Sequence, residues 1–483
     1  MTSFGEGSRS GFCERHYVVL AVAVLAVAAF NLTFRLGSEV VTEWDESLYA
    51  ISAHEMVRSG NWIATTFLGQ LDYYNTKPPL NVWLIALAFK ALGTSLYSLR
   101  VPSVVSAWLT VAVLLLWSRR RFGAAVGLLA ALVLSTTFGF LYVHSARNAN
   151  TDALFTLLIL LTVVTLSGAE DVPWRGAWLG PIVAAAFLLR GMAALMPLAI
   201  AAAVAVFAPR RQSRRLLPAV VGGLLFLAPV SAWAGARYGV DEWRFFRGLV
   251  GYDFVARSVS VLEGHPGGPL YYLHILVKHH YDWLLAGTVA AALFPLDWSR
   301  WREPLWPRGT HRRLGVLLLS WAGVTFLVPT LMLTKLPWYL NPFYPVFAVG
   351  TSWIVVRGLT QTAARARRVV LACVVVLVLG VAEAKLLSYS VHYRDVERSV
   401  QGLLLAEGHA LAGQQVFSRH WDRAEMFVLE AVVRARRGLA ADVDEFLRQS
   451  QIGDFLVASR DVRHAQLVVV RSVGHQQLYR RRE

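Results

Sequence analysis

The sequence predicts a mainly α-helical, polytopic membrane protein with a small α/β domain at its C-terminal end. Of 483 residues, 56% are hydrophobic and only 16% are charged, whereas soluble domains are nearer a quarter charged. The hydrophobic residues form blocks of roughly 15–20 residues separated by short arginine-rich loops, as in transmembrane bundles. The net charge of +16 does not indicate nucleic-acid binding, because much of the arginine excess lies in these loops.

Four arginine clusters fix the predicted orientation, because short cytoplasmic loops carry an excess of lysine and arginine. The clusters are Arg119–Arg121, Arg210–Arg215, Arg300–Arg313 and Arg357–Arg368. With the N-terminus inside, all four are cytoplasmic if the chain crosses the membrane about eleven times and ends outside. The predicted crossings are residues 17–36, 99–117, 123–143, 153–168, 176–189, 192–208, 216–236, 283–297, 314–333, 338–356 and 369–387.

This orientation places several segments on the outer side of the membrane. The stretch Asn81–Leu92 is too short to cross comfortably and is expected to lie along the outer interface. The predicted domains are a transmembrane domain over residues 1–387 and an outer C-terminal domain over residues 388–483, in which Gln466–Val470 has a β-like pattern. The other outer segments are residues 37–98, 144–152, 237–282 and 334–337. Large outer loops and a tail domain indicate chemistry at the outer face.

The first outer loop begins with two acids, Asp45 and Glu46, at the start of a predicted amphipathic helix that ends near Ser59. Two roles fit Asp45 equally well. In one, Asp45 caps the helix and interacts with the positive end of its dipole. In the other, Asp45 is a general base that deprotonates an acceptor hydroxyl close to the membrane.

The same loop ends with Lys77-Pro78-Pro79. The two prolines hold Lys77 in extended backbone and prevent a helix there. An ammonium fixed at the level of the lipid headgroups suits a phosphate ligand. The alternative is that Lys77 simply extends towards lipid phosphates.

The second outer loop, residues 145–152, is polar between two apolar spans and contains Arg147 and Asp152. Asp152 is either the N-cap of the next helix or a site residue. The turn at Arg190-Gly191 interrupts an apolar hairpin, and its charge is tolerated if the turn lies at the outer surface or lines a wet cavity.

Further candidates lie in the later outer segments, namely Arg257, His265, Lys335 and Tyr339. A single histidine beside proline and glycine is usually a loop residue, so His265 is only a weak metal candidate and no metal site is predicted. The Asp442-Val443-Asp444 sequence has the form of a metal-binding DxD motif, but acids are expected at the start of the helix that follows. The sequence has no dinucleotide or Walker fingerprint.

Over about residues 40–340 the chain resembles the bacterial GT-C membrane glycosyltransferases, close to the protein O-mannosyltransferases and the aminoarabinose lipid A transferases. The most specific elements are Asp45-Glu46-x-x-Tyr49-Ala50 with Ser59-Gly60-Asn61-Trp62, and Tyr74-Asn75-Thr76-Lys77-Pro78-Pro79-Leu80. The resemblance implies a polyprenyl-phosphate sugar donor, an inverting transfer outside the cytoplasm, and a lipid, protein or glycan acceptor. It also implies a location in the inner membrane with the active site facing the periplasm.

The resemblance also assigns roles to residues. Asp45, with Glu46 beside it, is the leading catalytic candidate, and Asp152 supports the site. The donor phosphate is expected to bind Lys77, Arg257 and Tyr339, with Lys335, Arg147 and Arg190 as further candidates. Some relatives bind zinc through a glutamate before the lysine and a downstream histidine. Here Thr76 occupies the glutamate position although His265 is present, so no cofactor is firmly expected.

The main alternative function is a transporter or flippase of lipid-linked sugars. Transporters carry charged residues near the middle of their spans and often have two similar halves. In this sequence the charges gather at the ends of the spans and in the outer loops, and no internal repeat is visible. The sequence therefore favours an enzyme.

Overall fold

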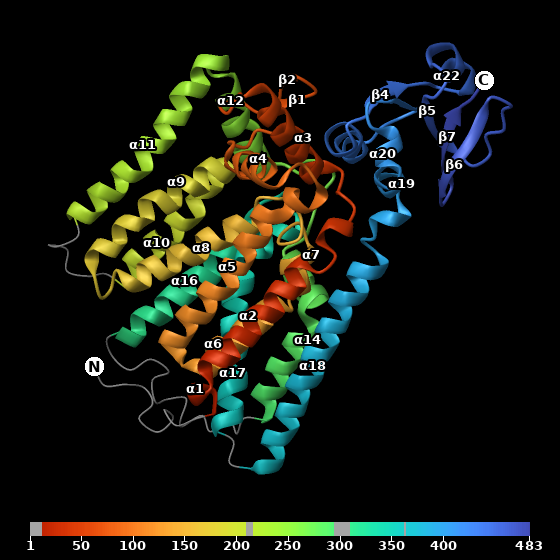
Figure 1. Cartoon of the computed structure of the whole chain (residues 1–483). Coiled ribbons are helices and arrows are strands. Elements are labelled where there is room, and N and C mark those ends of the chain that lie inside the picture. The colour runs from red at the N-terminus through yellow and green to blue at the C-terminus, as the bar shows by residue number, and fades with distance from the viewer. Residues whose placement is uncertain (1–11, 209–215, 294–309, 362–363) are drawn as a thin grey trace.

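The computed structural model describes residues 12–208, 216–293, 310–361 and 364–483. Long helices form a bundle, and the chain carries smaller elements at one end of it, which we call the outer end (Figure 1). The long helices are α2 (Tyr17–Thr33), α5 (Leu96–Phe122), α6 (Ala124–Ser135), α8 (Asp152–Gly168), α9 (Leu179–Arg190), α10 (Leu195–Phe207), α11 (Leu216–Asp241), α14 (Tyr271–Leu293), α16 (Thr310–Leu331), α17 (Tyr344–Gln361) and α18 (Arg365–His392).

Each of these helices overlaps one predicted crossing, and the short α7 (Phe138–Tyr142) completes the crossing that α6 begins. In the described part of the chain, six helical segments are long and apolar enough to cross a membrane by themselves. The polytopic helical fold is therefore confirmed. The arginine cluster at 210–215 lies outside the described residues. Of the cluster at 300–313, the residues before Thr310 also lie outside them.

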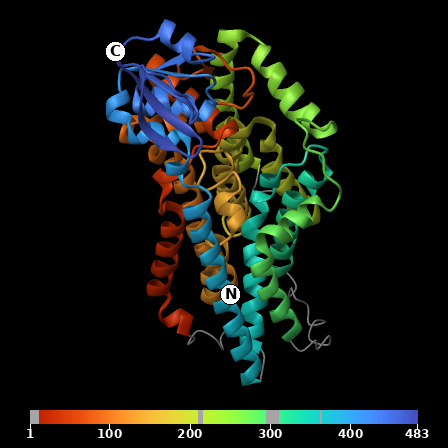
Figure 2. The same ribbon diagram turned by 90° about the vertical axis from the view of Figure 1, so that its right-hand side faces the viewer.

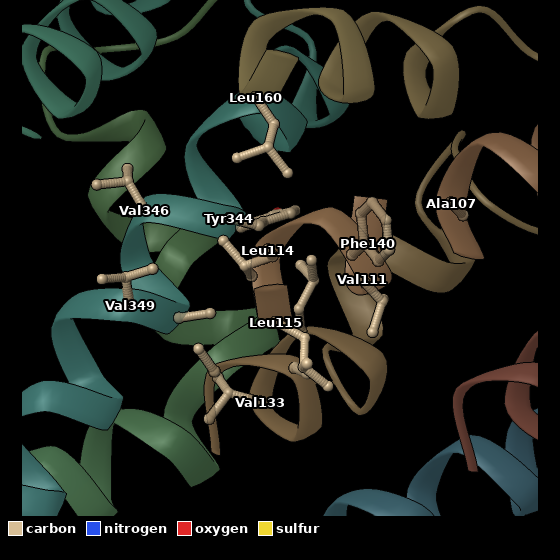
Figure 3. Close-up of a cluster of buried hydrophobic side chains, with 14 of the residues drawn as sticks. Ala107, Val111, Leu114, Leu115, Val133, Phe140, Leu160, Tyr344, Val346 and Val349 are labelled. Atoms are coloured by element: carbon tan, nitrogen blue, oxygen red, sulfur yellow. The ribbon is translucent and has the colours of Figure 1, made fainter. Parts of the chain in front are cut away.

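The bundle core is made by close helix packing around α5. Figure 3 shows Val111, Leu114 and Leu115 of this helix against side chains of α6, α7, α8 and α17. A Cβ atom at Gly127 of α6 would lie 2.8 Å from the Leu115 carbonyl oxygen, so glycine is what lets α6 approach α5. A Cβ atom at Gly139 would meet the Tyr344 hydroxyl at 2.5 Å.

The outer end carries α3 (Trp44–Ser59), the small hairpin β1 (Thr66–Phe67) and β2 (Gln70–Leu71), and α4 (Leu80–Leu92). The segment predicted to lie at the outer interface is α4, which packs against α3, α5 and α9. Gly60, with φ 71°, ends α3 in the left-handed conformation that glycine adopts without strain.

The C-terminal tail forms a five-stranded sheet at the same end, as Figures 1 and 2 show. Its order is β4-β3-β5-β7-β6, with β3 parallel to β4 and β5 and the other pairs antiparallel. The strands are β3 (Gln415–Ser418), β4 (Arg436–Leu439), β5 (Phe455–Ser459), β6 (Leu467–Val473) and β7 (Gln476–Arg481). The predicted α/β tail is confirmed, and α18 continues to His392, beyond the predicted boundary at 387.

The tail and the first outer loop share one hydrophobic cluster. Tyr49 and Phe89, from α3 and α4, belong to the same buried group as Trp421 and Phe427 of the tail. The rings of Phe89 and Phe427 are stacked with their centroids 6.0 Å apart. The tail is thus packed on the helix that carries Asp45.

Candidate active site

A pocket of about 920 Å³ opens at the outer end of the bundle. Its polar wall comes from the start of α3, the 74–77 loop, the loop before α8 and the 252–265 segment. Its apolar wall comes from α10 and from the outer end of α16. The predicted site residues that line it are Asp45, Lys77, Arg190, Arg257, His265 and Tyr339.

Asp45 lies in the first turn of α3 and forms an ion pair with Lys77, whose Nζ is 3.2 Å from Asp45 Oδ2. The structure shows no side-chain cap on α3, whose N-cap residue is Glu43, so the capping alternative for Asp45 is not observed. Burial by itself would raise the pKa of Asp45. The attraction of Lys77 and of His144 outweighs burial and lowers this pKa from 3.8 to about 2. The carboxylate is therefore ionised at neutral pH.

Lys77 is held in a matching environment. Its ammonium lies 5.5 Å from the centre of the Tyr49 ring as well as beside Asp45. Burial by itself would lower the pKa of Lys77, but Asp45 and Tyr49 outweigh it and raise this pKa. Lys77 is thus a permanent cation in the pocket.

His144 is a pocket residue that the sequence analysis did not single out. Its ring bridges two acids, with Nε2 3.5 Å from Asp45 Oδ2 and Nδ1 3.1 Å from Asp152 Oδ2. The ring stacks on Trp338 at a centroid distance of 4.1 Å. The backbone of His144 has φ 56°, a left-handed conformation that costs a non-glycine residue free energy. Its only sequence signal is a titratable ring where an apolar span meets a polar loop.

Asp152 contacts two of the residues that line the pocket. The carboxylate is fully buried, and besides His144 it accepts a hydrogen bond of 2.7 Å from Nη1 of Arg190. The Arg190 guanidinium lies 5.8 Å from the centre of the Tyr339 ring. Asp152 begins α8, and its oxygens contact His144 and Arg190; its supporting role in the site stays a prediction.

Arg257 lies on the 252–265 segment of the polar wall. It is paired with Asp253 at 3.4 Å and with Glu263 at 3.2 Å. Both acids also line the pocket, and neither was singled out from the sequence. An anionic ligand that binds Arg257 therefore competes with carboxylates already in place.

Arg394, which follows α18, is another pocket residue found only in the structure. It is 7% exposed and forms an ion pair of 3.4 Å with Glu39. Its second terminal nitrogen, Nη2, is buried without a hydrogen-bond partner among the described residues. The start of the C-terminal tail thus supplies a further cation to the pocket.

Besides Asp152, which contacts lining residues without lining the pocket itself, three predicted site residues do not reach the pocket, and the structure corrects their placement. Glu46 is fully buried and accepts hydrogen bonds from Arg100 at 2.8 Å and from the backbone of Thr42 at 2.8 Å. Arg147 is fully buried and binds Glu39 and the carbonyl oxygens of Asn31 and Phe34. Both residues use their charge to join the outer loops to the helix ends.

The third is Lys335, whose ammonium donates hydrogen bonds to the carbonyl oxygens of Thr330 and Met332. These carbonyls end α16 and have no partner within the helix, so a cation there satisfies them and interacts favourably with the helix dipole. Lys335 is therefore occupied at the helix end rather than pointing to a donor phosphate.

The residues at the expected metal position do not fit a metal ion. His265 lines the pocket, but Thr76, in place of a glutamate, offers only a neutral hydroxyl. No group of three or more His, Cys, Asp or Glu suited to a metal occurs in the described ranges. Asp442, of the DxD sequence, caps α22 (Val443–Gln449) by accepting a hydrogen bond of 2.8 Å from the Glu445 backbone, which confirms the structural interpretation.

Solved structures have a similar fold. The structure of ArnT from Cupriavidus metallidurans bound to undecaprenyl phosphate matches with a TM-score of 0.68 at 18% identity, over 96% of this chain and 97% of that one. The oligosaccharyltransferase of Archaeoglobus fulgidus in its apo form matches with a TM-score of 0.57 at 13% identity, over 93% of this chain and 70% of that one.

Comparisons of the sequence give named relatives of this chain. A family model described as dolichyl-phosphate-mannose-protein mannosyltransferase matches residues 76–234. The undecaprenyl phosphate-alpha-4-amino-4-deoxy-L-arabinose arabinosyl transferase of Pseudomonas savastanoi pv. phaseolicola is 29% identical over 71% of this chain, and that of Pseudomonas paraeruginosa is 30% identical over 71%. The matches span 63% and 61% of these relatives' lengths. The chain has the GT-C fold, and the resemblance stated from its motifs is confirmed.

Proposed function

We propose that this protein transfers a sugar from a polyprenyl-phosphate donor to an acceptor at the outer face of the membrane, with inversion at the anomeric carbon. The observation that carries the proposal is the pocket itself. It joins three cations, Lys77, Arg190 and Arg257, to an apolar wall that includes Met196 and Met332. A lipid phosphate needs both surfaces, and the sequence relatives are named for an undecaprenyl phosphate donor.

In this reaction the bond between the anomeric carbon and the donor phosphate oxygen breaks, and an acceptor oxygen forms the new bond. Polyprenyl phosphate leaves with an additional negative charge. Fixed positive charges that lie at the leaving oxygen lower the barrier, because they stabilise charge that develops only in the transition state. Lys77 and Arg257, with the Tyr339 hydroxyl, are placed to do this.

The low pKa of Asp45 bears on the acceptor. A general base works best with a pKa near the working pH, and a carboxylate with a pKa of about 2 is a weak base. A hydroxyl acceptor must lose a proton, whereas a phosphate acceptor is already ionised. We therefore favour a phosphate-bearing acceptor, with Asp45 orienting His144 and Lys77, and with Arg394 as a further cation of the pocket.

Transfer is tested by incubating the purified chain with a panel of radiolabelled polyprenyl-phosphate sugars and candidate acceptors. We expect label to move from the carrier to an acceptor. Lys77→Ala should raise the KM for the donor by about tenfold or more, since a charge-assisted contact to phosphate is lost, and Lys77→Arg should retain part of the affinity.

The matched control for this experiment is Lys90→Ala, which removes an exposed lysine of the same outer region that does not line the pocket. Its KM should stay within about twofold of wild type. Label that remains on the carrier in every reaction, while labelled carrier crosses the bilayer of proteoliposomes, would instead establish the flippase alternative.

We further propose that the protein lies in the inner membrane with this pocket on the periplasmic side. Reporter fusions after Arg121 and after Arg215 should be cytoplasmic, whereas fusions after Gly264 and at the C-terminus should be periplasmic. The pocket and the tail lie at the same end of the bundle, so the last two must agree. A cytoplasmic signal from the C-terminal fusion would contradict this orientation.

A further inference from the structure

A basic and aromatic surface lies where α14 and α18 pack together, outside the pocket. We call it the α14–α18 surface and define it by His274, Lys278 and Tyr281 of α14 and by Lys385 and Tyr389 of α18. His274 and Lys278 are exposed, and Tyr281 is 50% exposed. On α14 they alternate with exposed Leu273, Val277 and Leu285, so this face points to lipid.

The surface lies near the outer ends of both helices. Figures 1 and 2 show α14 and α18 running along the bundle, and the two helices are in contact. The outer end of α14 is Tyr271, and Lys278 comes about two helical turns after it. The outer end of α18 is His392, and Lys385 comes about two helical turns before it. At 1.5 Å per residue, each lysine is about 10 Å from its helix end. Lys385 also contacts Tyr281, which lies about one helical turn from Lys278, so the two cations lie close together.

Lys385 has no polar partner at this depth. Its ammonium nitrogen is buried without a hydrogen-bond partner among the described residues. It is enclosed by two rings, with the centroid of Tyr281 at 4.6 Å and that of Phe138 at 5.1 Å. The His279 ring stacks on the Phe138 ring, with the two centroids 5.6 Å apart. Asp282 attracts Lys385 only at longer range, and its Oδ1 accepts a hydrogen bond from its neighbour's backbone.

Cations that face hydrocarbon are costly unless an anion accompanies them. A single exposed lysine reaches bilayer headgroups by extending its stem, which accounts for Lys278 alone. It does not account for a second, enclosed lysine and two histidines that gather beside it. Basic side chains between transmembrane helices bind anionic lipid headgroups, and tyrosines favour the membrane interface.

We propose that the α14–α18 surface binds the phosphate headgroup of an anionic lipid at the outer side of the membrane. Lys278 and Tyr281 contact the headgroup from the exposed side. Lys385 lies beneath, and rotation of its flexible stem turns the ammonium from the rings towards the phosphate. None of the five defining residues lines the pocket, so this site is separate from the donor site and does not depend on sugar transfer.

The test uses the full chain in a neutral detergent, titrated with cardiolipin, which carries two phosphates, and in parallel with phosphatidylcholine, which has no net charge. Binding is measured by native mass spectrometry. We expect Lys278→Gln and Lys385→Met each to weaken cardiolipin binding by about fivefold, and the double variant by about 25-fold. Phosphatidylcholine binding should not change in any variant.

Lys90→Gln is the matched control, because Lys90 is an exposed lysine that also lies over a ring, 5.7 Å from the centre of Trp62, but on a different surface. Its cardiolipin affinity should remain within about twofold of wild type. The exposed position of Lys278 keeps the test valid even if Lys385→Met disturbs packing. Wild-type affinity in Lys278→Gln, or an equal loss in Lys90→Gln, would overturn the proposal.

Discussion

Asp45→Asn is expected to abolish most turnover while leaving the protein folded. The amide keeps the shape of the side chain but loses the charge that pairs with Lys77 and His144. We expect kcat to fall by about 10²–10⁴, a range typical for loss of an acid–base or charge-positioning group. Turnover is measured with the labelled donor, and folding is measured by thermal melting in detergent.

The pH dependence gives a second measurement on Asp45. Its pKa is lowered, so the ionised form is favoured in the folded protein and its contribution is present above about pH 4 and lost as the pH falls towards 2. The wild-type rate should therefore show no step near pH 3.8. Asp45→Glu, which restores the charge one methylene further out, should recover part of the rate. A variant Asp45→Asn that turns over within about threefold of wild type would assign Asp45 to structure.

Glu46→Gln should unfold the outer region rather than impair the chemistry selectively. Its partner Arg100 is also fully buried, and the two side chains are joined by an ion pair of 2.8 Å. Removing one charge of a buried pair leaves the other uncompensated and costs about 3–5 kcal/mol. We expect a large drop in melting temperature, with activity lost in proportion to the folded fraction.

Glu55→Gln is the control on the same helix. Glu55 is only partly buried and accepts hydrogen bonds from Thr66 and from the Gly69 backbone. Its replacement should therefore lower the free energy of unfolding by only about 1 kcal/mol. If Glu46→Gln melts like wild type and yet loses turnover, Glu46 acts in the reaction and its assignment to a structural role is wrong.

The sequence predicted which segments lie together at one end of the bundle better than it predicted which charges meet. Arginine clusters and apolar blocks determine orientation locally, so α3, the Lys77 loop and the tail were placed on one side. The contact between Asp45 and Lys77, which are 32 positions apart, depends on how the loop folds back. The family resemblance assigned both residues to the site but did not predict this contact between them.

The misplacement of Glu46 and Arg147 has a physical cause. A charge in an outer loop has the same sequence pattern whether it faces a pocket or a buried partner. The partners that decide this are distant, since Arg147 is 108 positions from Glu39, and Arg100 lies inside a predicted crossing. His144 was missed for the opposite reason, because it ends an apolar span and becomes functional only through Asp45 and Asp152.

The packing of the tail on α3 also determines when the pocket can be completed during biosynthesis. The ring of Phe427 stacks on Phe89, more than three hundred residues earlier in the chain. At about 5–20 residues per second, roughly 20–70 s pass between the synthesis of these partners. During that interval the apolar side of the first outer loop has no cover, and Arg394 has not yet reached the pocket. Newly made chains therefore pass through a stage in which the site is incomplete.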